Sequence, residues 1–402
     1  MKSVLEKTRL PEGFRDFGPE AAQALSNLSA RLERLYSSWG YRRVLTPSIE
    51  AEEVIAPGLG AGAAEGAFRM VDPLTGHALV FRPDITPQVA RLVATGAAGK
   101  NLPIKLCYRG SVVRRLAEGG HGAREVYQSG IENFGSAPEL ADAEVAALAL
   151  DLISETGLKE TVLELGDVRF VEGVLDELKL GDDERQDLTS AIDRKARAEI
   201  DSFLSKKKLA KETQKILEAL PDLFGGEETL ARAGKLSLPP KSKKAVESLK
   251  RLAGSLSSNG KIPARLCVDL AEVRGLDYYT GLLIAVYAPG ASRPILRGGR
   301  YDNLAARFGR DLPAVGFGVD LELLAGLSRA KNGEEDLSAP DVLLFDPQNR
   351  AEALLSEAAK LRAKGRRVFL FTGEGKEKDA QVLAKSLGIA KVQTVGNSKS
   401  KR

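Results

Sequence analysis

Three strand-like runs follow one another with short connections, and they restrict the fold more than any other feature of this sequence. They cover residues 105–108, 112–114 and 125–134. Leucines at helical spacing predict a helix ahead of them, at Leu25, Leu28, Leu32 and Leu35. Another helix is predicted at residues 139–155. Strands that pair in hairpins, with helices set between them, favour an antiparallel sheet backed by helices, which is an α+β fold.

A hairpin followed by a helix is predicted ahead of the three runs. Residues 68–71 and 78–82 are typical of two hairpin arms, with turn-forming residues between them. Thr86 is the expected N-cap of the next helix, because its hydroxyl can accept a backbone hydrogen bond. Pro87 then occupies the first helical position, where its missing N–H costs nothing.

The middle of the chain differs in character from the rest. Residues 167–260 are strongly charged and patterned as helices, and strand character returns after them. We therefore expect one sheet domain in two parts, residues 1–166 and 261–332, with a helical insertion at 167–260 between them. Beyond a charged linker, residues 338–402 alternate strand and helix and predict a small parallel α/β unit. Its five elements are expected at 341–345, 350–364, 367–371, 378–387 and 391–395.

The charge balance argues against a surface that coats nucleic acid. The 402 residues carry 59 basic and 55 acidic side chains, a net charge of +4, although this leaves room for a local basic patch. The start of the sequence lacks an apolar core of signal-peptide length, and no apolar run could span a bilayer. We therefore expect a cytoplasmic protein with no membrane association.

Cysteine and histidine are too few to build a zinc cluster or a histidine-based triad. The chain has two of each, namely Cys107, Cys267, His77 and His121. Both cysteines lie in strand-like sequence, which indicates buried thiols rather than a disulfide or a metal site. We therefore expect no metal and no other cofactor.

Strand periodicity gives the first indication of function. In the run 125–134, the alternate residues Gln128, Gly130 and Glu132 share one face. A glycine between a polar and a charged residue suits a ligand lying on the sheet, because the glycine leaves room and its neighbours hold the ligand. A solvent-exposed edge face explains the same pattern equally well.

Arg114 ends the strand before this face, and a loop rich in glycine and charge follows it at 117–124. Such a loop can cover a ligand on the sheet, or it can be a surface hairpin. Both interpretations place Arg114 next to the face that carries Gln128 and Glu132.

Residues 273–281 form the second cluster, in which two of only eight tyrosines are adjacent. Arg274 is a natural partner for a carboxylate, and the hydroxyls of Tyr278 and Tyr279 can orient a polar ring. Core packing explains one tyrosine, and a buried ion pair with Asp277 or Glu272 explains the arginine. Accidental packing does not explain the whole cluster. Glycine-rich strand ends at 298–302 and 313–323 complete the set, because glycine permits close approach of a ligand to the backbone.

Together these segments resemble the histidyl-tRNA synthetase family, in order from Leu10 to Glu322. The octet from Arg274 to Gly281 is the most specific part of the match. The resemblance implies a class II aminoacyl-tRNA synthetase fold that dimerises through its first motif, and a pocket for free histidine. It implies contacts to the amino group at Asp84, Thr86 and Gln128, to the carboxylate at Arg114 and Arg274, and to the imidazole at Glu132, Tyr278 and Tyr279.

Four positions depart from an active synthetase. Leu116 and Val126 stand where that family holds the adenine with a glutamate and an aromatic ring. Gly122 replaces an arginine of the covering loop, and Leu323 replaces the arginine that binds the terminal phosphate. In addition, Asp84 stands in place of a glutamate. Because adenylate formation needs these ATP contacts, no catalytic residue and no aminoacylation activity are expected.

These departures are similar to those of the regulatory subunits of ATP phosphoribosyltransferase. That resemblance implies a non-catalytic protein that forms a homodimer within a hetero-oligomer with a short-form catalytic subunit. It implies that the protein supports the activity of this partner and contributes to feedback inhibition by histidine in the first step of histidine biosynthesis. The near-neutral charge and short C-terminal unit predict no tRNA partner. The alternatives are a divergent, active histidyl-tRNA synthetase and a paralogue that binds tRNA or modifies another protein.

Overall fold

The computed structural model describes residues 8–59, 64, 66–115, 123–207, 209–258, 263–273, 278–328, 339–373 and 375–396. These residues belong to two compact units. The large unit contains residues 24–328 together with 8–16, and the small unit contains residues 339–396 together with 17–23. Within the described part of the chain, no helix is both long enough and apolar enough to cross a membrane.

A nine-stranded sheet forms the centre of the large unit. Its order is β1-β5-β6-β12-β11-β10-β7-β9-β8. The strands are β1 (Arg42–Arg43), β5 (Ile104–Val113), β6 (Glu125–Phe134), β7 (Val162–Asp167), β8 (Phe224–Gly225), β9 (Arg265–Asp269), β10 (Leu282–Tyr287), β11 (Leu296–Arg300) and β12 (Ala314–Asp320). The sheet is largely antiparallel, as predicted, and β1–β5 and β7–β9 are its parallel pairs. A parallel pair needs a long crossover connection, and the helical segment after β7 provides one for β9.

Two local predictions were wrong. Residues 105–108 and 112–113 belong to the single strand β5, because Gly110 and Ser111 continue the ladder opposite β6. Arg114 follows the strand and forms an isolated bridge with Ala67. The helix α5 (Thr86–Ala94) starts at Thr86 itself, with Ile85 at the N-cap position. The side chain that accepts the first backbone N–H is that of Asp84, at 3.2 Å from the nitrogen of Thr86.

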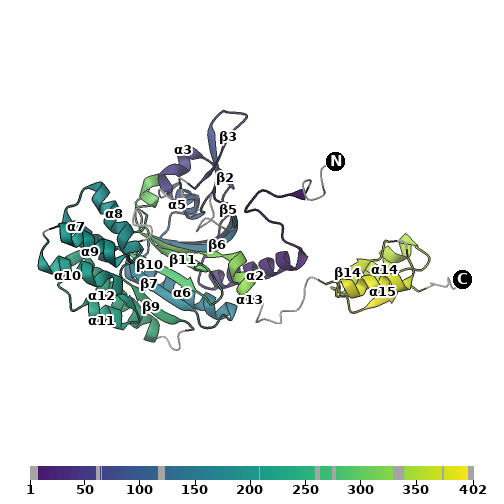
Figure 1. Cartoon of the computed structure of the whole chain (residues 1–402). Coiled ribbons are helices and arrows are strands. Elements are labelled where there is room, and N and C mark those ends of the chain that lie inside the picture. Colours follow the sequence, from purple (N-terminus) through teal and green to yellow (C-terminus); the bar gives the residue numbers. More distant parts are fainter. Residues whose placement is uncertain are drawn as a thin grey trace. The chain divides into compact units, whose positions relative to one another are not determined.

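One face of the sheet carries the main apolar core. Helix α6 (Pro138–Thr156) packs on this face, and helices α2 (Pro19–Ser38) and α13 (Leu321–Ser328) contribute to the same core (Figure 1). Tyr36 of α2 meets Phe317 of β12 edge to face, with ring centroids 6.3 Å apart. Alternate residues of β6 and β12 therefore point into this core, and the residues between them point to the other face.

The opposite face of the sheet is covered by α5 and a small three-stranded sheet. That sheet has the order β2-β4-β3, with β2 (Ile49–Ala51), β3 (Phe68–Val71) and β4 (Ala78–Phe81). Ile85 and Val89 pack with Tyr108 and Phe134 in a second core on this side. Helix α3 (Glu52–Ile55) and the 3-10 turns η1 (Ala56–Gly58) and η4 (Ala305–Phe308) complete the layer.

Helices fill the chain between β7 and β9 and gather on one side of the sheet (Figure 1). They are α7 (Val168–Leu178), α8 (Asp182–Asp193), α9 (Arg197–Lys206), α10 (Lys211–Ala219), η3 (Leu220–Asp222), α11 (Glu228–Ala233) and α12 (Pro240–Ser258). The short strand β8 of this segment pairs with β9. We call residues 167–260 the helical insertion. These boundaries are those predicted from the sequence, and they remain a prediction.

The small unit contains the five elements predicted for it, in the predicted order. They are β13 (Val342–Phe345), α14 (Ala351–Ala363), β14 (Val368–Leu370), α15 (Glu377–Ser386) and β15 (Val392–Thr394). The three strands are parallel, with β13 in the middle. Leu354 of α14 packs with Val342 and Leu344, whereas α15 packs with Leu343 and Phe345, so the two helices cover opposite faces.

Candidate functional site

A cavity of about 620 Å³ lies on the sheet face opposite α6. Seven of the eight residues predicted to bind a ligand line it together: Asp84, Thr86, Arg114, Gln128, Glu132, Tyr278 and Tyr279. The eighth, Arg274, lies outside the described residues, as do Leu116, Gly122 and most of the loop at 117–124. Chain segments that are almost 200 residues apart therefore meet around one space.

Glycines form the floor of this cavity. Gly316 of β12 stands opposite Glu132, and Gly318 stands opposite Gly130. A Cβ atom at Gly316 would collide with Oε2 of Glu132, and one at Gly130 would collide with the hydroxyl of Tyr108. The predicted face of β6 is thus part of a lined cavity, and Glu132 is only 1% exposed, which contradicts a solvent-exposed edge.

Glu132 has an unusual environment for a carboxyl group. Among the described residues, neither of its oxygens has a hydrogen-bond partner of normal geometry. Burial raises the pKa of Glu132 well above its usual value, while the nearby hydroxyls of Thr86 and Tyr108 partly oppose this shift. A buried polar group without a partner is uncommon in proteins, and it indicates a site that a ligand completes.

Three more polar atoms in the cavity wall lack a partner among the described residues. They are Oε1 of Gln128 and the hydroxyls of Tyr278 and Tyr301. The rings of Tyr278 and Tyr301 lie 5.4 Å apart. Burial raises the pKa of Tyr278, and the acidic groups of Asp84 and Glu132 add to this rise. The hydroxyl of Tyr278 is therefore a neutral hydrogen-bonding group.

Tyr301 was not among the predicted site residues, although its motif was noted. The alternation of side chains between the two faces of a strand could have indicated that Tyr301 belongs to the site. Gly299 and Tyr301 have the same parity, and Gly299 pairs with Gly316, which in turn pairs with Glu132. Residues paired across neighbouring strands point to the same face, so Tyr301 continues the row on the cavity side.

Thr280 fixes the tyrosine pair against Tyr301. Its N–H donates to the carbonyl of Arg300 at 2.7 Å, and its hydroxyl accepts from the N–H of Asp302 at 2.9 Å. Arg300 is buried and bonds Asp142 of α6 at 2.7 Å and Asp302 at 2.8 Å. The three tyrosines are thus held by an ion-pair network that reaches through the sheet to α6.

The opposite wall is built from the residues around the start of α5. Arg114 donates from Nε to the carbonyl of Pro83 at 3.1 Å, which ties the end of β5 to the residue before Asp84. The hydroxyl of Thr86 lies 3.5 Å from that of Tyr108. Asp84, Thr86 and Arg114 therefore present one carboxylate, one hydroxyl and one guanidinium to the cavity.

Two of the positions that depart from an active synthetase are described. Val126 lines the cavity beside Val112, so this part of the wall is apolar and not aromatic. Leu323 packs against the main core, and its N–H donates to Asp320. Two ion pairs lie nearby, Arg293 with Asp320 and Arg15 with Glu322.

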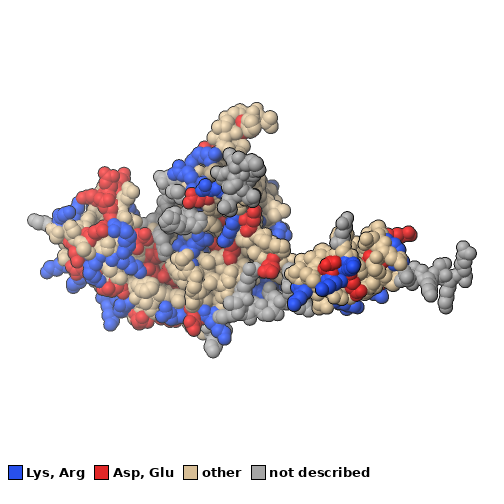
Figure 2. Space-filling model, turned by 45° about the vertical axis from the view of Figure 1, so that its right-hand side comes forward, with Lys and Arg blue, Asp and Glu red and all other residues tan. Residues whose placement is uncertain are grey.

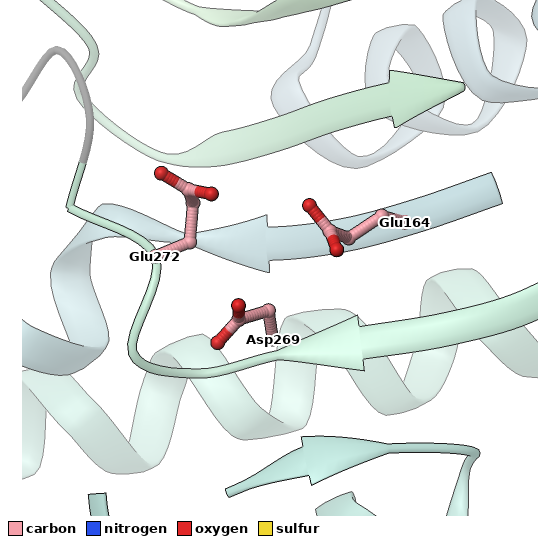
Figure 3. Close-up of side chains that lie close together, drawn as sticks. All are labelled: Glu164, Asp269 and Glu272. Carbon is pink, nitrogen blue, oxygen red and sulfur yellow. The ribbon is translucent and has the colours of Figure 1, made fainter. Parts of the chain in front are cut away.

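Three carboxylates that sequence reasoning did not group come together at the far end of the cavity (Figure 3). Glu164 of β7, Asp269 at the end of β9 and Glu272 in the following loop have oxygens within 4.8 Å of one another. Glu164 and Glu272 line the cavity, and Asp269 bonds Lys195 of the helical insertion at 2.7 Å. Glu164 is remote in sequence from Asp269 and Glu272, and the β7–β9 pairing brings it next to them.

Comparisons with known proteins agree with this architecture. Residues 13–324 match the family model described as histidyl-tRNA synthetase. A Geobacter metallireducens protein named ATP phosphoribosyltransferase regulatory subunit is 36% identical over 356 residues, which are 89% of this chain and 82% of that protein. A protein of the same name from Anaeromyxobacter dehalogenans is 39% identical over 81% of this chain and 92% of its own length.

A solved structure extends the similarity to the fold. It is a Bacillus halodurans protein described as an ATP phosphoribosyltransferase regulatory subunit/histidyl-tRNA synthetase, with a TM-score of 0.83 and 29% identity. The match covers 98% of this chain and 99% of that one. The chain therefore has the histidyl-tRNA synthetase-like, class II fold and belongs to the family of ATP phosphoribosyltransferase regulatory subunits.

Proposed function

We propose that this chain is a non-catalytic regulatory subunit that binds free histidine in the cavity and acts on a separate, short-form ATP phosphoribosyltransferase subunit. The observation that carries the proposal is the set of unpartnered polar atoms inside one cavity, on Gln128, Glu132, Tyr278 and Tyr301. Each such atom costs free energy while the cavity is empty, and a polar ligand of matching shape removes that cost.

The chemistry of the wall matches the three polar parts of histidine. Asp84, Thr86 and Gln128 provide acceptors for an ammonium group, and Arg114 provides a cation for a carboxylate. Glu132 with Tyr278 provides hydrogen-bonding partners for an imidazole ring. The carboxyl of Glu132 can donate when protonated and accept when ionised, so it can serve either protonation state of a ring nitrogen.

Two residues at positions where the synthetase family contacts ATP support a loss of catalysis. Val126 offers no aromatic surface for an adenine, and Leu323 offers no charge to a terminal phosphate. Removing one preorganised contact to a transition state typically costs about 3 kcal/mol. Several such losses, with Leu116 and Gly122 in the sequence as well, place adenylate formation out of reach.

Regulation requires more than binding. Histidine can inhibit a complex only if it binds two states of that complex with different affinity. We propose a homodimer of this chain within a hetero-oligomer, in which histidine binding biases the state of the catalytic partner. Basic and acidic side chains are interspersed over the surface in Figure 2, which supports a protein partner over tRNA.

Co-purification with a short-form ATP phosphoribosyltransferase tests the proposal, followed by assay of the complex with and without histidine. We expect a stable complex, activity that depends on this chain, and inhibition by histidine that disappears in the Glu132→Ala complex. A catalytic partner that is equally active and equally inhibited without this chain would contradict the proposal.

An active synthetase is the second candidate, because the matching family model carries that description. It predicts histidine-dependent exchange between ATP and pyrophosphate. We expect no exchange even at high protein concentration, and measurable exchange would establish the synthetase instead.

A further inference from the structure

The helical insertion reaches the end of β9, next to the cavity wall, with a residue whose backbone is strained. Lys195, between α8 and α9, has a φ of 50°, in the left-handed region that a non-glycine residue seldom adopts. The turn around it is closed by hydrogen bonds from the N–H groups of Lys195 and Ala196 to Ile192 and Ala191, at 2.9 and 2.8 Å. Strained backbone persists only where the surrounding structure holds it, and it tends to occur at functional positions.

The side chain of Lys195 leaves the insertion and reaches the sheet. Its Nζ donates to Oδ2 of Asp269 at 2.7 Å and lies 4.2 Å from the ring centre of Phe224. The Asp269 side chain is only 7% exposed, so the ion pair is screened weakly by solvent. The strained turn thus places an ammonium group at the end of β9.

Asp269 transmits this contact to the cavity wall. Its other oxygen, Oδ1, accepts the N–H of Ala271 at 2.9 Å, and Glu272 in the cavity wall follows immediately. The N–H of Leu270 bonds the carbonyl of Leu223 in the insertion at 3.0 Å. Where the chain leaves the tyrosine pair, the N–H of Val168 bonds the carbonyl of Gly281 at 3.1 Å. The insertion therefore contacts the chain on both sides of Tyr278 and Tyr279, and we call residues 278–281 the tyrosine-bearing segment.

Electrostatics adds a second reason why Lys195 matters. Asp269, Glu164 and Glu272 crowd three carboxylates together (Figure 3). Like charges at such a distance repel one another, and the ammonium of Lys195 offsets part of this repulsion. Without it, Glu272 is the member whose displacement changes the cavity directly, because it stands on a loop and lines the wall.

We propose that Lys195 is a positioning residue through which the helical insertion sets the affinity of the amino-acid cavity. It touches no ligand; it holds Asp269 and thereby the chain that enters the tyrosine-bearing segment. Anything that moves the turn between α8 and α9, such as a protein docking on the insertion, then alters ligand binding. The choice of histidine as the probe rests on the proposed function; the structural link does not.

The test compares Lys195→Met with Arg194→Met, a matched control in the same turn. Arg194 pairs with Glu199 inside the insertion, both side chains being about half exposed. In calorimetric titrations with histidine, we expect Lys195→Met to raise the Kd about tenfold, within the usual range of coupling between sites. Arg194→Met should bind as the parent chain does, and Lys195→Arg should restore most of the affinity because it keeps the charge.

Hydrogen exchange at the amides of Leu270 and Ala271 measures, without any ligand, whether Lys195 holds the chain that follows Asp269. Both amides should exchange faster in Lys195→Met than in the parent chain. Their exchange rates should be unchanged in Arg194→Met. If Lys195→Met folds poorly, Lys195→Gly replaces it, because glycine accepts the left-handed backbone while the side chain with its ammonium group is lost. It should keep the thermal midpoint while losing affinity, whereas a merely structural lysine would lower both together.

The outcomes separate this inference from the proposed function. If the parent chain binds histidine and Lys195→Met binds equally well, the inference is wrong and the histidine site stands. If the parent chain does not bind histidine, the proposed function fails, and exchange at Leu270 and Ala271 decides the inference. Faster exchange in Lys195→Met then supports the link, and unchanged exchange overturns it.

Discussion

Glu132 and Gly316 face each other across β6 and β12, and the carboxylate of Glu132 occupies the space that a side chain at position 316 would need. The buried side chain of Glu132 therefore requires a residue without a side chain at position 316. The glycine leaves the carboxyl group the space that it occupies. Any ligand that reaches the floor of the cavity meets this pair.

Gly316→Ala should therefore block the deep end of the cavity. Its Cβ would collide with Glu132 and with the carbonyl of Ile131. Overpacking of this kind costs about 1–3 kcal/mol, so we expect histidine affinity to fall by about 10- to 100-fold in calorimetric titrations. Gly326→Ala is the control, because a Cβ there meets nothing within 4 Å. Equal affinity in both variants would contradict the placement of the ligand.

Glu132→Ala and Arg274→Ala should each weaken histidine binding while the circular dichroism spectrum stays that of the folded chain. Glu132→Ala removes the proposed contact to the ring, and Arg274→Ala removes the contact to the carboxylate that the family resemblance implies. Glu125→Ala, on the same strand but on the other face, is the matched control. Unchanged affinity in both site variants would remove the assignment of this cavity to histidine.

Tyr301→Phe and Tyr36→Phe form a pair that separates ligand binding from packing. Both hydroxyls are buried without a partner among the described residues, but only Tyr301 lines the cavity. A hydrogen bond contributes about 1 kcal/mol net, so Tyr301→Phe should raise the Kd of histidine about fivefold. Tyr36→Phe should leave it unchanged. Loss of affinity in Tyr36→Phe would indicate a general effect on the fold.

Glu132 should also give the ligand-free protein a characteristic pH dependence. Its folded pKa is raised, so the protonated form stabilises the fold fully below the unfolded pKa, and this contribution is lost as pH rises through the folded pKa. Each unit of raised pKa corresponds to about 1.4 kcal/mol. In denaturant titrations between pH 5 and 8, Glu132→Gln should lose this slope and be more stable than the parent at pH 8. A parallel slope in both proteins would refute this cause.

Arg300→Met tests the network beneath the tyrosines. It leaves Asp142 and Asp302 without the guanidinium that they share, and Asp142 already has a pKa raised by burial. Breaking a buried ion pair typically costs about 3–5 kcal/mol, which denaturant titration should show. Arg251→Met, which breaks the exposed pair with Glu139, should cost less than about 1 kcal/mol. Similar losses would mean that burial does not strengthen the network.

Local patterns were sufficient to predict much of the fold. The small unit was predicted element by element because its strands and helices are short, regular and separated by clear breaks. The division of β5 into two runs was wrong because Gly110 and Ser111 are weak strand formers. Their place in the ladder is decided by pairing with β6, which no local propensity records.

The site was predictable where alternation and the family resemblance pointed to the same residues. Gln128 and Glu132 share a face by periodicity alone, and the resemblance added Asp84, Thr86 and the tyrosines. Tyr301 and Lys195 were missed for different reasons. Tyr301 follows from a row of residues across three strands, whereas the reach of Lys195 to Asp269 depends on a tertiary contact between the insertion and the sheet.

The parallel pairing of β7 with β9 has a consequence for how the chain is made. β7 leaves the ribosome long before β9, and the whole helical insertion is synthesised in between. Until β9 arrives, β7 has neither of its neighbouring strands, because β10 follows β9 in the chain, and the tyrosine-bearing segment does not yet exist. The insertion must therefore become compact early enough to bring β9 to its place. A deletion within the insertion that displaces β9 would therefore disturb the cavity, although it changes no residue of the cavity wall.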